Sequence, residues 1–303
     1  MKSNELLSPV EISSLRLQAQ QLLNSENPAH KLDSRDAGWL PTSALGSGMD
    51  YAESRAYQQG DDPRSINWRL SARSTETYVK TYHMEARPSV CVVLDQRRTM
   101  IFGTKKRLKI TQALRLAIII ASIAEQQRLT FNVVLVNKDV NWLGEQSLES
   151  FLQLANHAEI SDEPVSQTEN KHTLEQLGHY LDRYLDKGSL VFLISDFMDL
   201  DLSQPLQLSQ LPQNYSVQAL HIIDQVEQTL AKTQDICLHD MNSEATLSFN
   251  INKSADKQST SQVIADKHLF TIKQTILKSG IGYSPVLAHE NTIYPHINFT
   301  IGH

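Results

Sequence analysis

The stretch VCVVLDQRRTM (residues 90–100) decides the fold prediction, because an apolar run leads directly into an acid. An apolar run of this kind is typical of a strand that is buried on both faces in a parallel sheet. Asp95 would then lie at the carboxyl end of the strand, where open α/β sheets bind their ligands. The residues leave three roles open for Asp95: a metal ligand, the nucleophile of a phosphoryl-transfer enzyme, or neither.

From residue 89 onward strand patterns alternate with helix patterns, which predicts a mostly parallel sheet with helices on both faces. The predicted strands are 89–95, 130–137, 189–197 and 214–223, and the predicted helices are 106–127, 145–157, 171–187 and 203–211. Residues 108–124 are apolar nearly all round. We therefore expect the N-terminal region, with its amphipathic helix, to cover this segment on the side away from the sheet.

The pattern divides the chain into three parts. Residues 1–84 carry the first helix, a polar loop and a strand at 77–86, which we expect to lie at a sheet edge. Residues 85–225 form the α/β domain. Residues 226–303 form a C-terminal extension with two strands followed by a long helix.

Composition narrows the class of protein. The chain has 303 residues, of which 40% are hydrophobic and 20% charged, with a net charge of −6. The hydrophobic and charged fractions are typical of a globular protein. The negative net charge argues against nucleic-acid binding. We see no secretory signal, and the longest apolar run is too short to span a bilayer. With two cysteines, both in strand-like runs, we expect a cytoplasmic protein with reduced thiols.

The segment YQQGDDPRSINWRLSAR (residues 57–73) is the most unusual local sequence. Asp62 and Pro63 are suited to a helix start, and three arginines alternate with apolar residues that include Trp68. One interpretation is an Arg/Asp platform that grips a carboxylate or phosphate of a partner. The other, which we favour, is an ion-paired brace that locks this segment against the core through Trp68.

These residues resemble the DUF58 family, whose signature is R-x-Y-x-x-G-D-D-x-R-x-I-D-W-x-x-S-A-R. The matching residues are Arg55, Tyr57, Gly60, Asp61, Asp62, Arg64, Ile66, Trp68, Ser71, Ala72 and Arg73. Asn67 departs from the pattern, because the family usually has aspartate there. The resemblance continues through FGTKKRLKITQA (102–113), ISDF (194–197) and IIDQVEQTL (222–230).

The resemblance implies a von Willebrand factor A-like (Rossmann-like) domain, usually encoded beside a MoxR-type AAA+ ATPase. Some members of the family carry membrane helices, whereas this chain resembles the short soluble type. The expected partners are therefore a MoxR-type ATPase and other von Willebrand factor A proteins. No membrane span and no nucleic acid are expected.

The resemblance also implies a possible metal site. In a von Willebrand factor A domain the first strand ends in D-x-S-x-S, and these residues hold Mg²⁺ together with a later Thr and Asp. Asp95 and Thr99 match, Asp196 matches the later acid, and Thr173 matches the distal threonine. Arg97, however, stands where a serine should be, and a guanidinium has only donors and a permanent positive charge. We expect a degenerate site without metal or other cofactor, in which Arg97 pairs with Asp95 or Asp196 or turns to solvent. A Mg²⁺-dependent binding module is the alternative.

A phosphoryl-transfer enzyme is a second alternative. VVLDQRRT has the outline of the haloacid-dehalogenase motif, an apolar strand followed by D-x-D-x-T, with Asp95 as nucleophile and with Asp196 and Asp199 as the distal acids. Arg97 again occupies a position where this chemistry needs an acid or a small residue.

A run of basic residues without an acid lies between Gln96 and Ala124, and the pattern predicts that the helix begins near Lys105 or Lys106. Cations oppose the dipole in the first turn of a helix, so an anion docking there would relieve them. We consider a basic rim for an acidic partner, made by Arg98, Lys105, Lys106, Arg107 and Lys109. Pairing with the chain's own acidic stretch at 159–186, or a solvated surface, would explain the run equally. The resemblance to the DUF58 family thus implies a non-catalytic adaptor that works with a MoxR-type ATPase in assembling or remodelling protein complexes.

Overall fold

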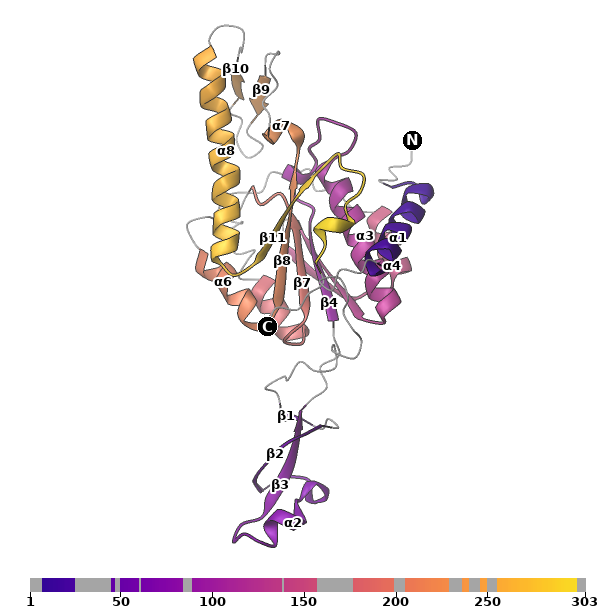
Figure 1. The fold of residues 1–303 in the computed structure, drawn as a ribbon, viewed down its shortest axis with the longest axis vertical. Coiled ribbons are helices and arrows are strands. Elements are labelled where there is room, and N and C mark those ends of the chain that lie inside the picture. The colour runs from indigo at the N-terminus through magenta and orange to yellow at the C-terminus, as the bar shows by residue number, and fades with distance from the viewer. Residues whose placement is uncertain are drawn as a thin grey trace.

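The computed structural model of the protein describes most of the chain (Figure 1). The described residues are 7–24, 45–46, 50–59, 61–83, 89–137, 139–156, 177–198, 205–228, 236–239, 246–249 and 255–298. The predicted Gly60, Thr173 and Asp199 lie outside these ranges, as do residues 240–245 between the two C-terminal strands and residues 159–176 of the acidic stretch 159–186. Among the described residues no helix is both long enough and apolar enough to cross a membrane.

A six-stranded sheet forms the centre of the molecule. Its order is β11 (Gly282–Leu287), β8 (Ser216–Ile223), β7 (Leu190–Ser195), β4 (Ser89–Asp95), β5 (Thr130–Val136) and β6 (Val140–Glu145). Neighbouring strands are parallel except β5 and β6, which form an antiparallel pair. The predicted architecture, a mostly parallel α/β sheet with helices on both faces, is confirmed. The four predicted strands correspond to β4, β5, β7 and β8.

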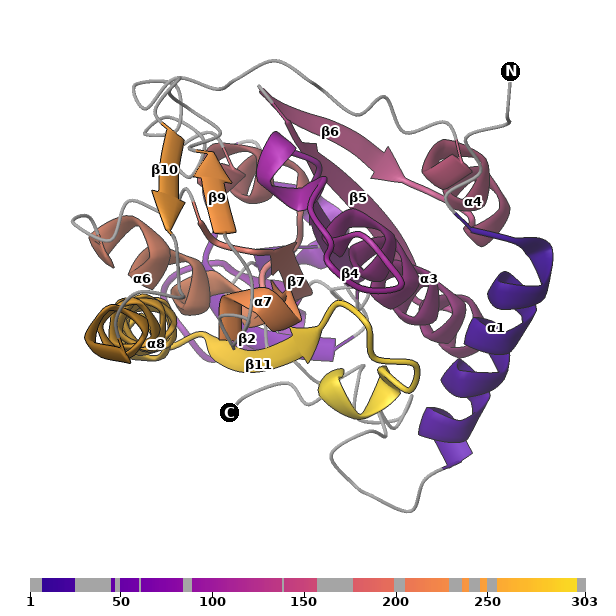
Figure 2. The ribbon, with the colours of Figure 1, turned by 90° about the horizontal axis from the view of Figure 1, so that it is seen from above.

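Helices cover both faces of this sheet, as Figure 2 shows from above. On one face lie α1 (Pro9–Asn24), α3 (Lys109–Gln127) and α4 (Leu148–Asn156), and on the other lie residues 177–184, α6 (Pro205–Asn214) and α8 (Ala255–Lys278). Successive residues of β4 alternate between the two cores, with Val92 and Leu94 in the first and Cys91 and Val93 in the second. Because both faces are covered, every residue of β4 is buried.

The apolar helix α3 lies between the sheet and α1, as predicted. Leu15, Ala19 and Leu22 of α1 are fully buried in the core that they share with α3. The helix begins at Lys109 and not near Lys105. Gly103 belongs to the tight turn that precedes it, since a Cβ atom at this residue would approach the Arg107 carbonyl oxygen to 2.3 Å.

The C-terminal part of the chain is joined to the same sheet. β9 (Ile236–His239) and β10 (Thr246–Phe249) form the expected antiparallel pair, and α8 is the expected long helix. After α8, β11 pairs in parallel with β8, so the sheet is not contained within residues 85–225. Shorter elements are the 3₁₀ turns η3 (Arg98–Met100) and η5 (Tyr294–His296) and the helix α7 (Gln225–Gln228).

The signature segment belongs to a separate antiparallel sheet, which we call the signature unit (residues 50–83 with the short strand β1). Its strands are β1 (Leu45–Gly46), β3 (Tyr78–His83) and β2 (Asp50–Ala56) in that order, with η2 (Pro63–Ser65) and α2 (Trp68–Ser71) between β2 and β3. β3 is therefore a central strand and not an edge strand. Figure 1 shows the signature unit projecting away from the six-stranded sheet.

Candidate functional site

Asp95 lies at the carboxyl end of the central strand β4, as predicted, and Arg97 holds it in a bidentate ion pair. The Arg97 Nε donates to Asp95 Oδ1 at 3.0 Å and Nη2 donates to Oδ2 at 2.7 Å, while the Arg97 backbone N–H also donates to Oδ1. Ser195, at the end of β7, donates its hydroxyl to Oδ2 at 2.6 Å. Both carboxylate oxygens are therefore engaged, and Asp95 is only 3% exposed.

The electrostatics of this pair favour the charged form of Asp95. Burial alone would raise the pKa of Asp95, but the charge and hydrogen bonds of Arg97, helped by the Ser195 hydroxyl, hold it below its usual value. The sequence left open whether the Arg97 side chain pairs with Asp95, pairs with Asp196 or turns to solvent. In the structure it pairs with Asp95.

Asp196, at the carboxyl end of the neighbouring strand β7, is paired with a different cation. Lys109 is the first residue of α3, is 2% exposed, and donates from Nζ to Asp196 Oδ2 at 2.9 Å. The same ammonium group donates to Glu227 Oε1 at 2.6 Å. Burial lowers the pKa of Lys109, but Asp196 and Glu227 outweigh burial and raise it overall. The Lys109 ammonium thus joins α3 to β7 and to α7.

The second oxygen of Asp196 is also engaged. Thr99 donates its hydroxyl to Asp196 Oδ1 at 3.3 Å, and the Met198 backbone N–H donates to the same oxygen at 3.2 Å. Phe197, which lies between Asp196 and Met198 in the chain, has a φ of 52°. This value is in the left-handed region, which non-glycine residues seldom adopt. The chain after β7 therefore turns sharply around Asp196, and backbone strain of this kind is often found at functional sites.

A third acid anchors the loop that leads into α3. Asp224 follows β8 and accepts hydrogen bonds from both the backbone N–H and the hydroxyl of Thr104. Burial raises the pKa of Asp224, but the Thr104 bonds reverse this effect and leave it lowered. The Asp224 backbone N–H donates to Glu227 Oε2 at 2.7 Å, so Glu227 bridges Asp224 and Lys109. We call the following eight residues the carboxyl-edge cluster: Asp95, Arg97, Thr99, Lys109, Ser195, Asp196, Asp224 and Glu227.

His221 lies beside this cluster in β8 and contributes no charge to it. The imidazole is 1% exposed, and its Nδ1 lies 2.8 Å from the Tyr283 hydroxyl. Burial, followed by the nearby Lys109 charge, lowers the pKa of His221 to about 3. The imidazole is therefore neutral at physiological pH.

The cluster does not fit the magnesium ion that the resemblance to von Willebrand factor A domains implies. A Mg²⁺ site needs several oxygen ligands free to coordinate, whereas the oxygens of Asp95 and Asp196 accept from Arg97, Lys109 and hydroxyl or amide donors. Two buried cations at the same place would repel a divalent ion. Among the described residues no group of three or more His, Cys, Asp or Glu side chains could hold a metal.

The predicted basic rim is divided by the structure into exposed and internal residues. Lys105 and Lys106 are exposed and Arg98 is partly exposed. Lys109 is not on the surface, because its charge is used within the cluster. Arg107 is partly buried and binds the backbone carbonyl groups of residues 289 and 290. The exposed rim is therefore limited to Arg98, Lys105 and Lys106.

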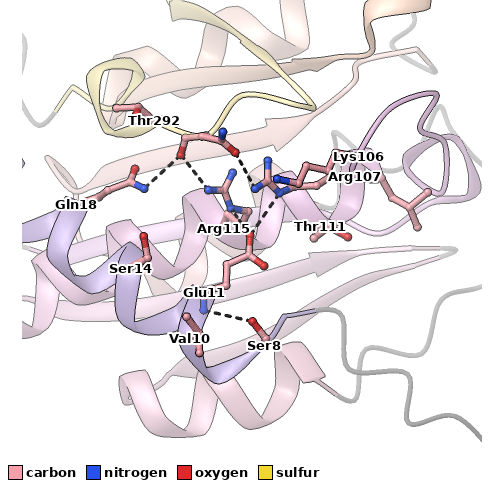
Figure 3. A pocket seen from close by; sticks show the side chains of 12 residues that line it. Ser8, Val10, Glu11, Ser14, Gln18, Lys106, Arg107, Thr111, Arg115 and Thr292 are labelled. Atoms are coloured by element: carbon pink, nitrogen blue, oxygen red, sulfur yellow. Dashed lines mark hydrogen bonds and ion pairs between the residues drawn. The ribbon is translucent and has the colours of Figure 1, made fainter.

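A cavity of about 700 Å³ lies between α1, the start of α3 and residues 291–292, and it is lined by arginines (Figure 3). Arg115 pairs with Glu11 of α1 at 2.9 Å and donates to the carbonyl groups of Glu290 and Asn291. Burial and the charge of Arg107 lower the pKa of Arg115 to about 10, against the opposing effect of Glu11, so it stays protonated at neutral pH. Arg107 and Arg115 both bind groups of the protein itself. The arginines of this pocket therefore connect α3 and the turn before it to α1 and to the C-terminal loop.

The residues of the signature segment make their own hydrogen-bond network. Arg55 forms a bidentate pair with Asp61, at 2.8 and 2.6 Å, which raises the pKa of Arg55 and lowers that of Asp61. Asp62 caps η2, and Asn67 caps α2 while donating to Ser54 at 2.9 Å. An amide thus serves where the family usually has an acid.

Other residues of this segment point outward. Trp68 is 69% exposed, so it does not anchor the segment against the core as the favoured interpretation required. Arg64, Arg69, Arg73 and Tyr57 are exposed as well, whereas Ser71 accepts a hydrogen bond from the Tyr78 backbone N–H.

The structure also reveals residues that sequence reasoning missed. Lys109 was assigned to the rim, and Ser195 and Glu227 were given no role in the site. For Glu227 a signal was available, because it follows Asp224 by three residues after a buried strand and so shares the end of that strand.

Solved structures with a similar fold were found at low similarity. The conserved hypothetical protein BatB of Bacteroides thetaiotaomicron is 13% identical with a TM-score of 0.42, and the match covers 69% of this chain and 94% of that one. An aerotolerance-related membrane protein from Bacteroides fragilis is 10% identical with a TM-score of 0.40, and the match covers 68% and 93%.

Sequence comparison identifies the family. The uncharacterized proteins Rv1480 of Mycobacterium tuberculosis and Mb1516 of Mycobacterium bovis are each 24% identical over 223 residues, or 68% of this chain. The match spans 65% of the length of these relatives. The sequence model of a family described as "Protein of unknown function DUF58" matches residues 53–268, which is more than half of the chain. The chain therefore belongs to the DUF58 family.

Proposed function

We propose that the protein is a non-catalytic interaction adaptor that works with a MoxR-family AAA+ ATPase in assembling or remodelling protein complexes. The observation that carries the proposal is the saturation of the carboxyl-edge cluster by internal cations. Arg97 on Asp95 and Lys109 on Asp196 occupy the place where a ligand-binding metal would be expected. What this edge offers to a partner is therefore a fixed protein surface and not an exchangeable ion.

The state of Asp95 supports a non-catalytic role over phosphoryl transfer. A nucleophilic carboxylate needs an oxygen that can approach the phosphorus atom. Here Oδ1 accepts two hydrogen bonds from Arg97, and Oδ2 accepts one from Arg97 and one from Ser195. An incoming phosphate group would have to displace these hydrogen bonds, and a buried carboxylate that loses its partners is unfavourable in free energy. The free, buried thiol of Cys91 fits the cytoplasmic location that is part of this proposal.

The exposed rim gives this edge a charge that a partner can recognise. Lys105 and Lys106 are exposed in the turn before α3, and Thr104 of the same turn is tied to Asp224 at the end of β8. The rim therefore has a fixed position relative to the cluster. Positive charge held at a fixed position increases the association rate with an acidic surface and selects against basic ones.

We expect the double variant Lys105→Gln/Lys106→Gln to bind the purified MoxR-type ATPase of the same organism more slowly. Loss of two surface charges should lower the association rate constant by about three- to tenfold at low salt, with a smaller effect at high salt. Biolayer interferometry at two salt concentrations measures this rate. The matched control is Lys187→Gln/Lys278→Gln, which removes two exposed lysines near the amino ends of β7 and β11. No binding of the ATPase by the wild-type chain would contradict the proposed partner, and equal rates for both variants would contradict the role of the rim.

A further inference from the structure

Few of the side chains that the structure describes in the signature unit are buried. Among its described side chains, between residues 54 and 80, only Val79 is buried. Trp68 is 69% exposed, Tyr57 39% and Leu70 38%. Small sheets of two or three strands need a covered apolar face to be stable. Trp68, Tyr57 and Leu70, which could provide this cover, are instead exposed to solvent.

Hydrogen bonds hold the backbone of this unit in one conformation nevertheless. Asp61 accepts from Arg55 and from the Gln58 backbone N–H, and Asp62 accepts from the Arg64 backbone N–H. Asn67 caps α2, and its own backbone N–H donates to Tyr78 of β3 at 2.7 Å. The short helix that carries Trp68 is therefore fixed to the strand beneath it before any partner arrives. Preorganisation of this kind lowers the entropy cost of binding.

Three cations accompany Trp68 in the same short segment. Arg64 lies in η2, Arg69 in α2 and Arg73 just after it, and all three are exposed. Within the part of the chain that the structure describes, none of them makes an ion pair, whereas Arg55 is paired with Asp61. The acids of the segment are already used, because Asp61 binds Arg55 and Asp62 caps η2. The three guanidinium charges are thus available to an external anion.

We propose that Trp68, Arg64, Arg69 and Arg73 form a docking face for an acidic segment of a partner protein, in which an apolar side chain covers Trp68 and carboxylates pair with the arginines. This inference rests on the proposed function, because it places the acidic segment on the AAA+ ATPase. Exposed tryptophan and arginine are the residue types most enriched among those that dominate binding energy at protein interfaces. Planar guanidinium groups also bind carboxylates with two parallel hydrogen bonds.

The surface fits a protein better than a nucleic acid. Proteins that bind single strands stack successive bases on several aromatic side chains along a positively charged groove. Here Trp68 is the one aromatic ring among residues 61–77, and the chain as a whole has a net charge of −6. An acidic peptide can pair its carboxylates with the three exposed arginines while one apolar side chain covers Trp68.

The test compares variants of the full chain against three probes. The variants are Trp68→Ala and Arg69→Gln/Arg73→Gln, with Trp68→Phe as the conservative substitution and Lys187→Gln/Lys278→Gln as the charge-matched control. The probes are the purified ATPase of the same organism, a fluorescein-labelled peptide of repeated Glu-Asp-Leu, and a labelled oligo(dT) strand. Circular dichroism and melting temperature establish that each variant is folded.

We expect Trp68→Ala and the double arginine variant to weaken binding of the ATPase and of the acidic peptide by about tenfold or more. Trp68→Phe should retain most of the affinity, and the control variant should bind like the wild type. If the ATPase binds and these substitutions do not weaken it, the docking face is wrong and the proposed function stands. If only the peptide binds and the substitutions weaken it, the docking face stands and the ATPase is not the partner. If the wild-type chain binds neither the ATPase nor the acidic peptide, both the docking face and the proposed function are wrong. If it binds oligo(dT) more tightly than the acidic peptide, and Trp68→Ala weakens that binding, the assignment of a protein partner is wrong.

Discussion

Replacing Lys109 with methionine is expected to lower the free energy of unfolding by about 3–5 kcal/mol at neutral pH. Methionine has nearly the same volume, so the packing against the Phe102 ring, whose centroid lies 5.5 Å from the Lys109 Nζ, changes little. The substitution leaves Asp196, which is 1% exposed, and the largely buried Glu227 without the cation that both contact. A buried carboxylate without a counter-charge is among the most unfavourable arrangements in a protein core. Urea unfolding followed by circular dichroism measures the change.

The exposed neighbour Lys106 supplies the control for this experiment. Lys106→Met removes the same charge from a solvated side chain and should change stability by less than about 0.5 kcal/mol. Because the pKa of Lys109 is raised on folding, its contribution is complete below its unfolded pKa of about 10.4 and is lost only as the pH rises through the folded value. Equal stabilities of the two variants at pH 7 would mean that the Lys109 ammonium does not hold the edge together.

Replacing Arg97 with methionine should have the second-largest effect, a loss of about 2–4 kcal/mol at pH 7. The substitution removes two side-chain hydrogen bonds and the balancing charge from Asp95, leaving the Ser195 hydroxyl and a backbone N–H as donors. The same urea titration measures it, with Arg98→Met as the control, since Arg98 is more exposed and adjacent in the chain.

The effect of Arg97→Met should depend on pH in a direction that identifies its cause. In the wild type the pKa of Asp95 is lowered on folding, so its contribution is present above the unfolded pKa of about 3.9 and is lost as the pH falls through the folded value. In the variant, burial without Arg97 should raise this pKa, so acid protonates Asp95 and relieves the unpaired charge. The stability difference between wild type and variant should therefore shrink as the pH falls from 7 towards 4. A difference that is constant over this range would show that Arg97 acts through packing and not through charge.

The central strands could be predicted from the sequence because burial on both faces leaves a continuous apolar run. SVCVVLD in β4 and LVFLIS in β7 are such runs, and each is followed or ended by an acid at the carboxyl edge. The edge strands could not be predicted with the same signal. β6 (VNWLGE) and β11 (GYSPVL) are only partly buried, and β11 contains Pro285, which is tolerated in an edge strand but is a weak strand signal.

The role of Lys109 could not be predicted, because the residues that determine it are distant in the sequence. Leu108 precedes α3 without a side-chain cap, so nothing local indicates that the helix begins at Lys109. The start is fixed by contacts across the fold, among them the bonds from Thr104 to Asp224. Within a run of basic residues, Lys109 resembles its exposed neighbours until Asp196 and Glu227 are brought to it.

The location of Trp68 was mispredicted for a related reason. An interleaving of arginines with apolar residues is compatible with both a brace and a platform, and only the arrangement of strands decides between them. Because β3 pairs with β1 and β2, and these three strands form a sheet separate from the six-stranded one, the segment between β2 and β3 is not part of the central core, and its Trp68 is exposed. Helix capping depends on neighbouring residues and can therefore be predicted from local sequence. The predicted Asp62 cap is present in the structure, together with a second cap by Asn67.

A crystal structure of the wild-type chain grown in millimolar Mg²⁺ tests most directly whether internal cations, and not a metal ion, neutralise the acids of the carboxyl-edge cluster. The account predicts Lys109 Nζ in contact with Asp196 and Glu227, and Arg97 in its bidentate pair with Asp95, with no ion bound between these acids. An octahedral ion with oxygen ligands at about 2.0–2.1 Å on Asp95, Asp196 or the Thr99 hydroxyl, with Arg97 or Lys109 displaced, would contradict it.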